Sequence, residues 1–315
     1  MRVYKKWANN PIQFLAMTGY SVTDFLALIS YFKESHNNYF SKFELNGKRK
    51  KQFRKFVIYG NSPLPTVEDR LAFILSYKKL NPIQQLQAFL FDMTQKQCNQ
   101  FVHSLTIVLE DALTNASVMP ATTAQQLLEK LQNEEEIILF HDGTEREIPR
   151  PVDEDAQKEN YSGKKKKHTL KNGLIVTTLL TILFMGATVS GSTHDKKIAD
   201  QQYYTALESA KAIITLFQDT GYQGFAPEGV IIKQGSKKQK GKELTIEQKQ
   251  KNKALSSIRI MVEHAIGSIK RYRIVKDECR LRKNRYPYKI MAICAGLHNF
   301  RIERNPVNYP EIKLT

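Results

Sequence analysis

The stretch ILFHDGTEREIPRP, residues 138–151, begins as an apolar run, stops at Asp142 and continues into glycine, threonine and a series of charges. Apolar runs bounded by turn residues are typical of buried strands, so the pattern predicts a strand over 136–142 that Asp142 ends. LFQDTGYQGF, residues 216–225, repeats the arrangement at Asp219. Ligands of α/β sheets bind beyond the carboxyl ends of strands, and we therefore expect the two aspartates to converge.

The segments around these aspartates alternate between strand and helix patterns. Strands are predicted at 166–179, 181–192 and 212–219, and helices at 195–211, 243–274 and 288–304. This order indicates an α/β fold with a mixed sheet and flanking helices. Residues 172–193 are long enough to span a bilayer, but their threonines, glycines and β-branched residues favour buried strands. No membrane segment is therefore expected.

The N-terminal part is predicted to be all-α. Helical spacing appears at 11–40 and 66–80, and further helix starts lie at Pro82 and at Thr94. Short connections between three helices are compatible with a helix-turn-helix, and a purely structural three-helix bundle remains open. The candidates for reading bases stand at the start of the last of these helices: Gln95, Lys96, Gln97 and Asn99.

Charge indicates the partner. The 315 residues are 41% hydrophobic, which is enough for folded domains, and 48 Lys and Arg outnumber 31 Asp and Glu to give a net charge of +17. Such a surplus attracts polyanions, and DNA is the leading partner. Basic residues are concentrated at 1–60, 231–253 and 264–304, and 47–56 alone holds six of them. Cys98, Cys279 and Cys294 lack the spacing of a disulfide framework or zinc site, which fits a reducing cytoplasm.

A third acid is expected from the helix SSIRIMVEHAIGSIK, residues 256–270. Ser256, Arg259, Glu263, Gly267 and Lys270 share one face of it at spacings of three and four. Converging carboxylates repel each other unless a cation lies between them, and a pair of Mg²⁺ ions roughly 3.5–4 Å apart is the usual arrangement for phosphodiester chemistry. Glu263 would then bind metal, and Arg259 and Lys270 would bind DNA phosphates. Turn capping by the aspartates and a surface ion pair on the helix are the alternatives.

The chain resembles the DDE transposases of bacterial insertion sequences, specifically the insertion-sequence-five group related to Harbinger elements. The matching pieces, in order, are DGTEREIPRP, YSGKKKKHTLK, GSTHDKKIAD, QDTGYQGF and RIMVEHAIGSIKRYRI. The resemblance implies an RNase H-like domain whose metal-binding triad is Asp142, Asp219 and Glu263, with Mg²⁺ as cofactor and Mn²⁺ able to replace it. Arg259, Glu263 and Lys270 fit the family signature Y-x2-R-x3-E-x6-K, but Ser256 occupies the tyrosine position.

Asp195, in GSTHD, matches a recurrent acid of the family and is a further candidate metal ligand. We prefer Asp219 as the second triad member, because Asp195 opens a predicted helix and capping is a sufficient explanation for it. Lys164, Lys165, Lys166 and Lys167 are predicted to contact DNA, as are Arg271, Arg273 and Lys96, although a solvated turn is the alternative for the lysine run. His141, His194, His264 and His298 show no metal-binding spacing and are expected to be structural or to face DNA.

These observations predict a DNA transposase that binds the terminal inverted repeats of its element, hydrolyses a phosphodiester and joins the 3′-hydroxyl to target DNA. A structure-selective nuclease and a non-catalytic repressor are the alternatives. A homodimer or higher assembly on DNA and a cytoplasmic, nucleoid-associated location are expected. The predicted organisation is a basic helical region (1–60), a helix-turn-helix domain (61–118), a connector (119–136), the RNase H-like domain (137–304) and a tail (305–315).

Overall fold

The computed structural model describes residues 3–53, 55–238, 243–280 and 286–307. The predicted tail beyond residue 307, and parts of the basic segments at 231–253 and 264–304, lie outside this range. The chain divides into two compact units, one formed by 1–119 with 270–277 and the other by 120–269 with 278–315. Each unit is described by itself.

The first unit is helical within the described residues, as predicted. Its helices are α1 (Val3–Ala8), α2 (Pro11–Thr18), α3 (Val22–Lys42), α4 (Val67–Leu80), α5 (Gln84–Leu90), α6 (Gln95–Asn115) and α12 (Arg273–Lys276). Gly19 ends α2 with a positive φ of 81°, so the helix expected over 11–40 is two helices. Side chains cap α3, α4 and α6, and at α6 Thr94 and Gln97 form a capping box.

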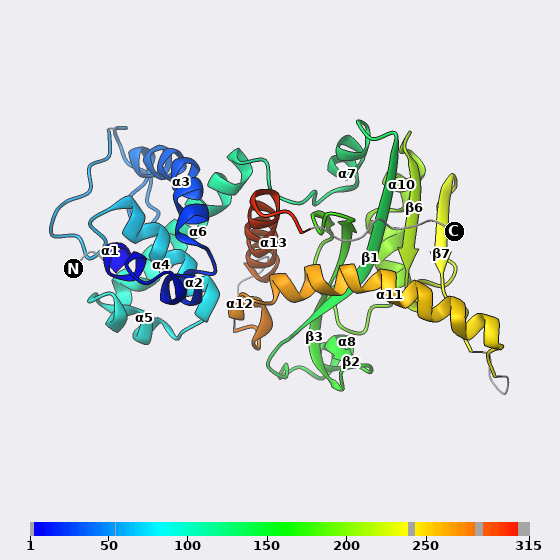
Figure 1. Cartoon of the computed structure of the whole chain (residues 1–315). Helices are drawn as coiled ribbons and strands as arrows, with labels where there is room; N and C mark the ends of the chain where they lie inside the picture. Colours follow the sequence, from blue (N-terminus) through cyan, green and yellow to red (C-terminus); the bar gives the residue numbers. More distant parts are fainter. Residues whose placement is uncertain (1–2, 54, 239–242, 281–285, 308–315) are drawn as a thin grey trace. The chain divides into compact units, whose positions relative to one another are not determined.

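The second unit is built on a seven-stranded mixed sheet (Figure 1). The strands are β1 (Glu136–Glu147), β2 (Tyr161–Ser162), β3 (Lys167–Thr177), β4 (Ile182–Met185), β5 (Val189–Ser190), β6 (Ile213–Gln218) and β7 (Val230–Gln234). Their order is β2-β3-β1-β6-β7, and β4 and β5 also pair with β3. β1 is antiparallel to β3 and parallel to β6, which is parallel to β7. The predicted mixed α/β sheet is confirmed.

Helices cover both faces of this sheet. They are α7 (Ala124–Leu131), α8 (Glu154–Asn160), α9 (Asp195–Gln202), α10 (Tyr204–Glu208), α11 (Ile246–Ile269) and α13 (Tyr286–Arg304), and a 3₁₀ turn η1 spans Thr220–Tyr222. On one face α9 and α10 contribute to a buried apolar cluster with Leu139, Ile175 and Leu216. α11 passes across β1, β6 and β7 (Figure 1), and its Arg259 meets Asp142 and Asp219 on the opposite face. The two faces of β1 therefore meet different helices.

One sequence-based expectation about the sheet needs correction. β1 does not end at Asp142, because its antiparallel ladder with β3 continues to Glu147 after its parallel ladder with β6 stops at Phe140. Conversely, β6 ends at Gln218, so Asp219 does follow the strand directly, as predicted. The apolar stretch 172–193 forms strands of the sheet, as expected. No single helix in the described ranges is long and apolar enough to cross a membrane, although α2 and α3, bent by 50°, pass that test as a pair.

Candidate active site

Asp142 and Asp219 lie beside each other because of strand register. The last parallel pair between β1 and β6 is Phe140 with Phe217, and each aspartate comes two residues later on its strand. Since side chains alternate between faces with a period of two, both aspartates point to the face that α11 covers. Arg259 of α11 lies between them, with its guanidinium nitrogens 3.7 Å from Asp142 Oδ2 and 3.6 Å from Asp219 Oδ1. The predicted convergence of the two acids is therefore present.

The environment of Asp142 disfavours its charge. Burial raises the pKa of its carboxyl to about 6, against the lowering effects of Arg259 and of the hydrogen bond that Gly143 N donates to Oδ1 at 2.7 Å. The neighbouring charges of Asp219 and Asp195 raise it further. One guanidinium at ion-pair rather than hydrogen-bond distance does not compensate two carboxylates. The site therefore has capacity for further positive charge.

Asp219 is held by the turn that it opens. Its Oδ1 accepts a hydrogen bond from Thr220 N at 2.6 Å, and its carbonyl oxygen accepts one from Gln234 Nε2 of β7 at 2.7 Å. Its side chain is nevertheless 41% exposed. Asp219 therefore does cap the turn that follows it, which was the alternative explanation for this residue. The exposed part of its carboxylate remains accessible to a ligand.

A buried histidine aligns the strands directly behind the two aspartates. His141 Nε2 lies 3.0 Å from Gln218 Oε1, and Nδ1 lies 2.9 Å from the Tyr203 hydroxyl. Because Gln218 Nε2 donates to Phe225 O, Gln218 Oε1 accepts from His141, whose Nδ1 then accepts from Tyr203. Burial lowers the pKa of His141 to about 3, so the ring is neutral and structural, one of the two roles expected for it. The sequence analysis missed Gln218 and Tyr203 as supports of the site.

The opposite face of β1 carries a separate group of charges. Lys171 Nζ lies 3.2 Å from Asp195 Oδ1 and 3.7 Å from Glu145 Oε1, and it donates to Thr193 O at 2.9 Å. Asp195 sits over Gly143, where a β-carbon would come within 2.7 Å of its Oδ1. We call Glu145, Lys171 and Asp195 the α9-side cluster. The sequence analysis did not single out Glu145; polar residues on both faces of an otherwise buried strand are the signal that could have found it.

The capping explanation of Asp195 is wrong. The N-cap of α9 is His194, which makes no side-chain cap hydrogen bond, and Asp195 is the first residue of the helix. Its Oδ1 is buried and accepts no hydrogen bond, although Lys171 lies at ion-pair distance. Asp195 is therefore a half-buried member of the ion-pair cluster on the α9 side. Its position on the α9 side separates it from the face that Asp142 and Asp219 share.

Glu263 lies on α11 one turn after Arg259, so the two side chains project from the same side of the helix. It is exposed, as is Ser256 at the signature tyrosine position. In the parts of the chain that the structure describes, no three His, Cys, Asp or Glu side chains form a cluster that could hold a metal ion. The structure thus brings Asp142, Asp219 and Arg259 together and leaves Glu263 accessible on the helix that faces them.

The predicted DNA-binding residues occupy several places. Lys164, Lys165 and Lys166 are exposed in the turn between β2 and β3, and Lys167 pairs with Glu147 at 2.7 Å. Lys96 is exposed at the start of α6. Three of the other base-reading candidates already have partners: Gln95 and Asn99 donate to Gln84 Oε1, and Gln97 closes the capping box. Lys270, Arg271 and Arg273 belong to the first compact unit, where Arg273 pairs with Asp277.

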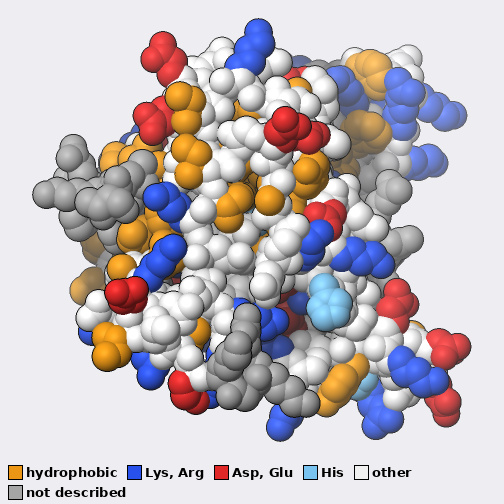
Figure 2. Space-filling view, turned by 90° about the vertical axis from the view of Figure 1, so that its right-hand side faces the viewer, with side chains coloured by type: hydrophobic (Ala, Val, Ile, Leu, Met, Phe, Trp, Pro, Cys, Tyr) orange, Lys and Arg blue, Asp and Glu red, His pale blue; other side chains and the backbone are white. Residues whose placement is uncertain are grey.

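The chemistry of the Asp142 and Asp219 pair fits a hard divalent cation. Carboxylate oxygens are the ligands that Mg²⁺ prefers, and the guanidinium of Arg259 occupies the place between them that a cation would take. The Arg259 Nε atom is buried without a hydrogen-bond partner, so this arrangement is not a saturated ion pair. Figure 2 shows acidic and basic side chains interspersed on one side of the molecule.

Two acids side by side on a mixed sheet are compatible with an enzyme that cleaves phosphodiesters, and comparison with known proteins identifies the family. Residues 141–299, about half of the chain, match the family described as DDE superfamily endonuclease, and the chain belongs to that family. The match includes Asp142, Asp195, Asp219, Arg259 and Glu263.

A similar protein is the "Probable transposase for insertion sequence element IS702" of Microchaete diplosiphon. It is 26% identical over 243 residues, which are 77% of this chain and 83% of that protein. No solved structure matches the chain. Family and relative together support a nuclease or transposase enzyme whose substrate is DNA.

Proposed function

We propose that the protein is a DNA transposase of the insertion-sequence-five group, related to Harbinger elements. It binds the terminal inverted repeats of its element, hydrolyses a phosphodiester at each end and joins the released 3′-hydroxyl to target DNA. The observation that carries the proposal is the register of β1 and β6, which sets Asp142 and Asp219 side by side facing α11. The strand order β3-β1-β6-β7, with one antiparallel and two parallel pairings, supports an RNase H-like fold.

Asp142 and Asp219 would hold the metal, and Glu263 would complete the set from α11. When bound, Mg²⁺, or Mn²⁺ in its place, would activate the attacking oxygen and stabilise the leaving one. Arg259 lies where it can bind a DNA phosphate once the carboxylates no longer need its charge. The lysines at 164–167 supply phosphate contacts beside the sheet. His141 and Gln218 hold the two acidic strand ends in register.

The first compact unit binds the DNA ends. Within the first unit, α5 and α6 are joined by a short turn and serve as a helix-turn-helix, with Lys96 at the exposed start of the second helix. Lys270, Arg271 and Arg273 add phosphate contacts from the same unit. Joining two ends requires coordinated subunits, so the active form on DNA is a dimer or higher assembly. In the cell such an enzyme acts at the nucleoid.

The test is a cleavage and joining assay on a labelled duplex carrying the terminal repeat, with Mg²⁺ or with EDTA. Wild type should cut at the repeat only with Mg²⁺ and then join the 3′ end to a plasmid. Asp142→Ala, Asp219→Ala and Glu263→Ala should bind the repeat and fail to cut. Cutting without preference for the repeat and without joining would favour a structure-selective nuclease. Repeat binding that ignores Mg²⁺, without any cutting, would favour a repressor.

A further inference from the structure

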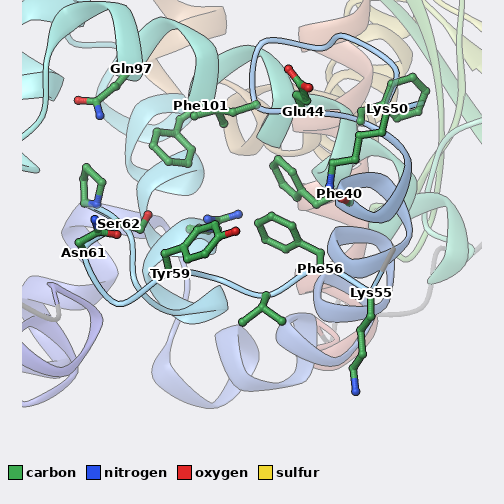
Figure 3. A pocket seen from close by; sticks show the side chains of 15 residues that line it. Phe40, Glu44, Lys50, Lys55, Phe56, Tyr59, Asn61, Ser62, Gln97 and Phe101 are labelled. Carbon is green, nitrogen blue, oxygen red and sulfur yellow. Dashed lines mark hydrogen bonds between the residues drawn. The ribbon is translucent and has the colours of Figure 1, made fainter. Parts of the chain in front are cut away.

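The first compact unit contains a pocket that the proposed chemistry does not use. It is a cavity of about 660 Å³ between the end of α3, the extended chain at 55–63, α4 and the start of α6. Figure 3 shows the rings of Phe40, Phe56, Tyr59 and Phe101 around it. The volume lies within the range of small-molecule and cofactor sites. Its walls are therefore aromatic and its size suits a flat ring compound.

The buried charged group among the lining residues is an arginine without an acidic partner in the described part of the chain. Arg70 is only 4% exposed, and within the described residues it pairs with no carboxylate. Its guanidinium lies about 5 Å from the ring centres of Phe40, Phe56 and Phe101. One nitrogen lies 2.8 Å from His36 Nε2 and another donates to Leu64 O at 3.4 Å.

The partner of Arg70 cannot neutralise it. Burial, followed by the charge of Arg70, lowers the pKa of His36 to about 4, so His36 is a neutral acceptor. Glu44, the acid among the lining residues, is exposed and accepts a hydrogen bond from Asn46. A buried cation that lacks an anion is costly unless acceptor atoms satisfy it. The pocket thus presents a planar fork of donors beneath aromatic walls.

A strongly basic segment leads into the same pocket. Residues 47–56 hold six Lys and Arg, and two of them, Lys50 and Lys55, belong to the lining. Lys50 Nζ donates to Phe40 O at 2.6 Å and stands 5.3 Å from the centre of the Phe56 ring. The Lys55 side chain points away from the cavity (Figure 3). Tyr59, 75% exposed, stands at the solvent side. Phosphodiester backbone can follow this segment while one base enters the pocket.

We propose that this pocket binds a single unstacked nucleobase of the DNA end, a role that rests on the proposed function. The base stacks on Phe56 and Tyr59, and its acceptor edge meets Arg70. Guanine fits best, because its O6 and N7 form the acceptor pair that an arginine fork binds in a bidentate manner. The lysines of 47–55 hold the flanking phosphates. The pocket accordingly selects DNA ends with an unpaired guanine.

The first experiment changes only the DNA. Fluorescence anisotropy of full-length wild-type protein is measured in EDTA with four labelled duplexes: fully paired, with one bulged guanine, with a bulged 7-deazaguanine and with a bulged abasic site. The bulged guanine should bind at least about fivefold tighter than the abasic site, because base stacking on aromatic rings contributes on that scale. The 7-deazaguanine, which lacks the N7 acceptor, should lose most of the guanine advantage. Equal affinity for guanine and abasic bulges would overturn the proposal.

The second experiment changes exposed side chains, since Arg70→Ala is expected to unfold the unit. Tyr59→Ala should reduce the preference for the bulged guanine to less than about twofold, and Tyr59→Trp should keep it. Lys55→Ala should weaken all four duplexes equally, whereas Lys33→Ala, an exposed lysine of α3 outside the pocket, should change none. Failure of Tyr59→Ala to alter the preference would also contradict the proposal.

Failure of the pocket and failure of the proposed function give different results. If wild type cuts and joins the paired repeat in Mg²⁺ but ignores the bulge, the pocket proposal is wrong and the transposase proposal stands. If it prefers the bulged guanine but never cuts the repeat, the pocket binds a base and the enzyme assignment fails.

Discussion

The two faces of β1 carry two groups of charges, one with Asp142 and the other with Glu145 three residues later, and the groups are compensated to different extents. On the α9 side, Lys171 serves both Glu145 and Asp195, is 10% exposed and has a backbone acceptor as well. On the α11 side, Asp142 and Asp219 share Arg259 at 3.6–3.7 Å and remain 23% and 41% exposed. Buried charges persist where partners satisfy them. On the α9 side the lysine nitrogen stands 3.2 Å from Asp195 Oδ1, whereas Arg259 stands farther from both aspartates of the α11-side pair, which leaves room there for a cation.

The strongest test of this difference is the loss of cleavage in single variants. Asp142→Ala and Asp219→Ala should each lower the cleavage rate by at least about 10³-fold, since metal stabilisation of the transition state supplies several kcal/mol and each 1.36 kcal/mol is tenfold. Asp195→Ala should stay within about tenfold of wild type. Rates are measured on the repeat duplex in Mg²⁺. Cutting abolished by Asp195→Ala, with a native melting profile, would show that the α9-side cluster takes part in the chemistry.

Gly143 lies next to Asp142 on β1 and directly beneath Asp195, so a side chain at this position should disturb the α9-side cluster. In Gly143→Ala the new β-carbon would lie 2.7 Å from Asp195 Oδ1, so the Asp195 side chain has to shift, and its contact with Lys171 changes. Overpacking of this kind costs about 1–3 kcal/mol. Urea unfolding of both variants and wild type measures it, with Gly163→Ala as control because no atom lies within 4 Å of its added β-carbon. Equal stability of Gly143→Ala and Gly163→Ala would show that Asp195 is not held against the strand.

Removing one carboxylate charge should change the stability of the metal-free protein in opposite directions at Asp142 and at Asp195. The pKa of Asp142 is raised from 3.8 to about 6, so its contribution to stability is full below pH 4 and is lost as pH rises through 6. Two pKa units correspond to about 2 kcal/mol after allowance for partial exposure. Asp142→Asn should therefore stabilise the metal-free protein at pH 8 by about that amount. Asp195→Asn should destabilise it, because Lys171 loses a partner.

Urea unfolding of wild type, Asp142→Asn and Asp195→Asn in EDTA at pH 5, 6, 7 and 8 measures these stability changes. The stability gained by Asp142→Asn over wild type should grow between pH 5 and 7 and then level off. A pH-independent gain, or a loss at pH 8, would mean that Arg259 already compensates Asp142 in full.

The strands of the sheet were easier to predict from the sequence than the way in which they pair with one another. Apolar runs identified β1, β3, β4 and β6, and the order of acids identified Asp142 and Asp219, because these signals are local. The continuation of β1 past Asp142 was missed, since it depends on pairing with β3, a partner distant in sequence. For the same reason Asp195 was read as a helix cap, although Lys171 from β3 explains its position. β7 and the role of His141 also depend on strand register, which periodicity does not reveal.

Substitution of Arg259 should have the smallest effect of these variants, and it tests most specifically whether the Asp142 and Asp219 side accepts a cation. If it fills the place of a cation, Arg259→Gln should leave two facing carboxylates uncompensated and lower metal-free stability at pH 8 by about 1 kcal/mol, the scale of a partly exposed ion pair. Mg²⁺ should then raise the melting temperature of the variant more than that of wild type, because the metal no longer competes with the guanidinium and binds the folded state selectively. Lys171→Gln should lower stability as well, but added Mg²⁺ should not restore it, since Glu145 and Asp195 lie on the other face. A Mg²⁺ response of equal size in both variants would mean that either face can accept the ion, and that register alone does not select the metal-binding pair.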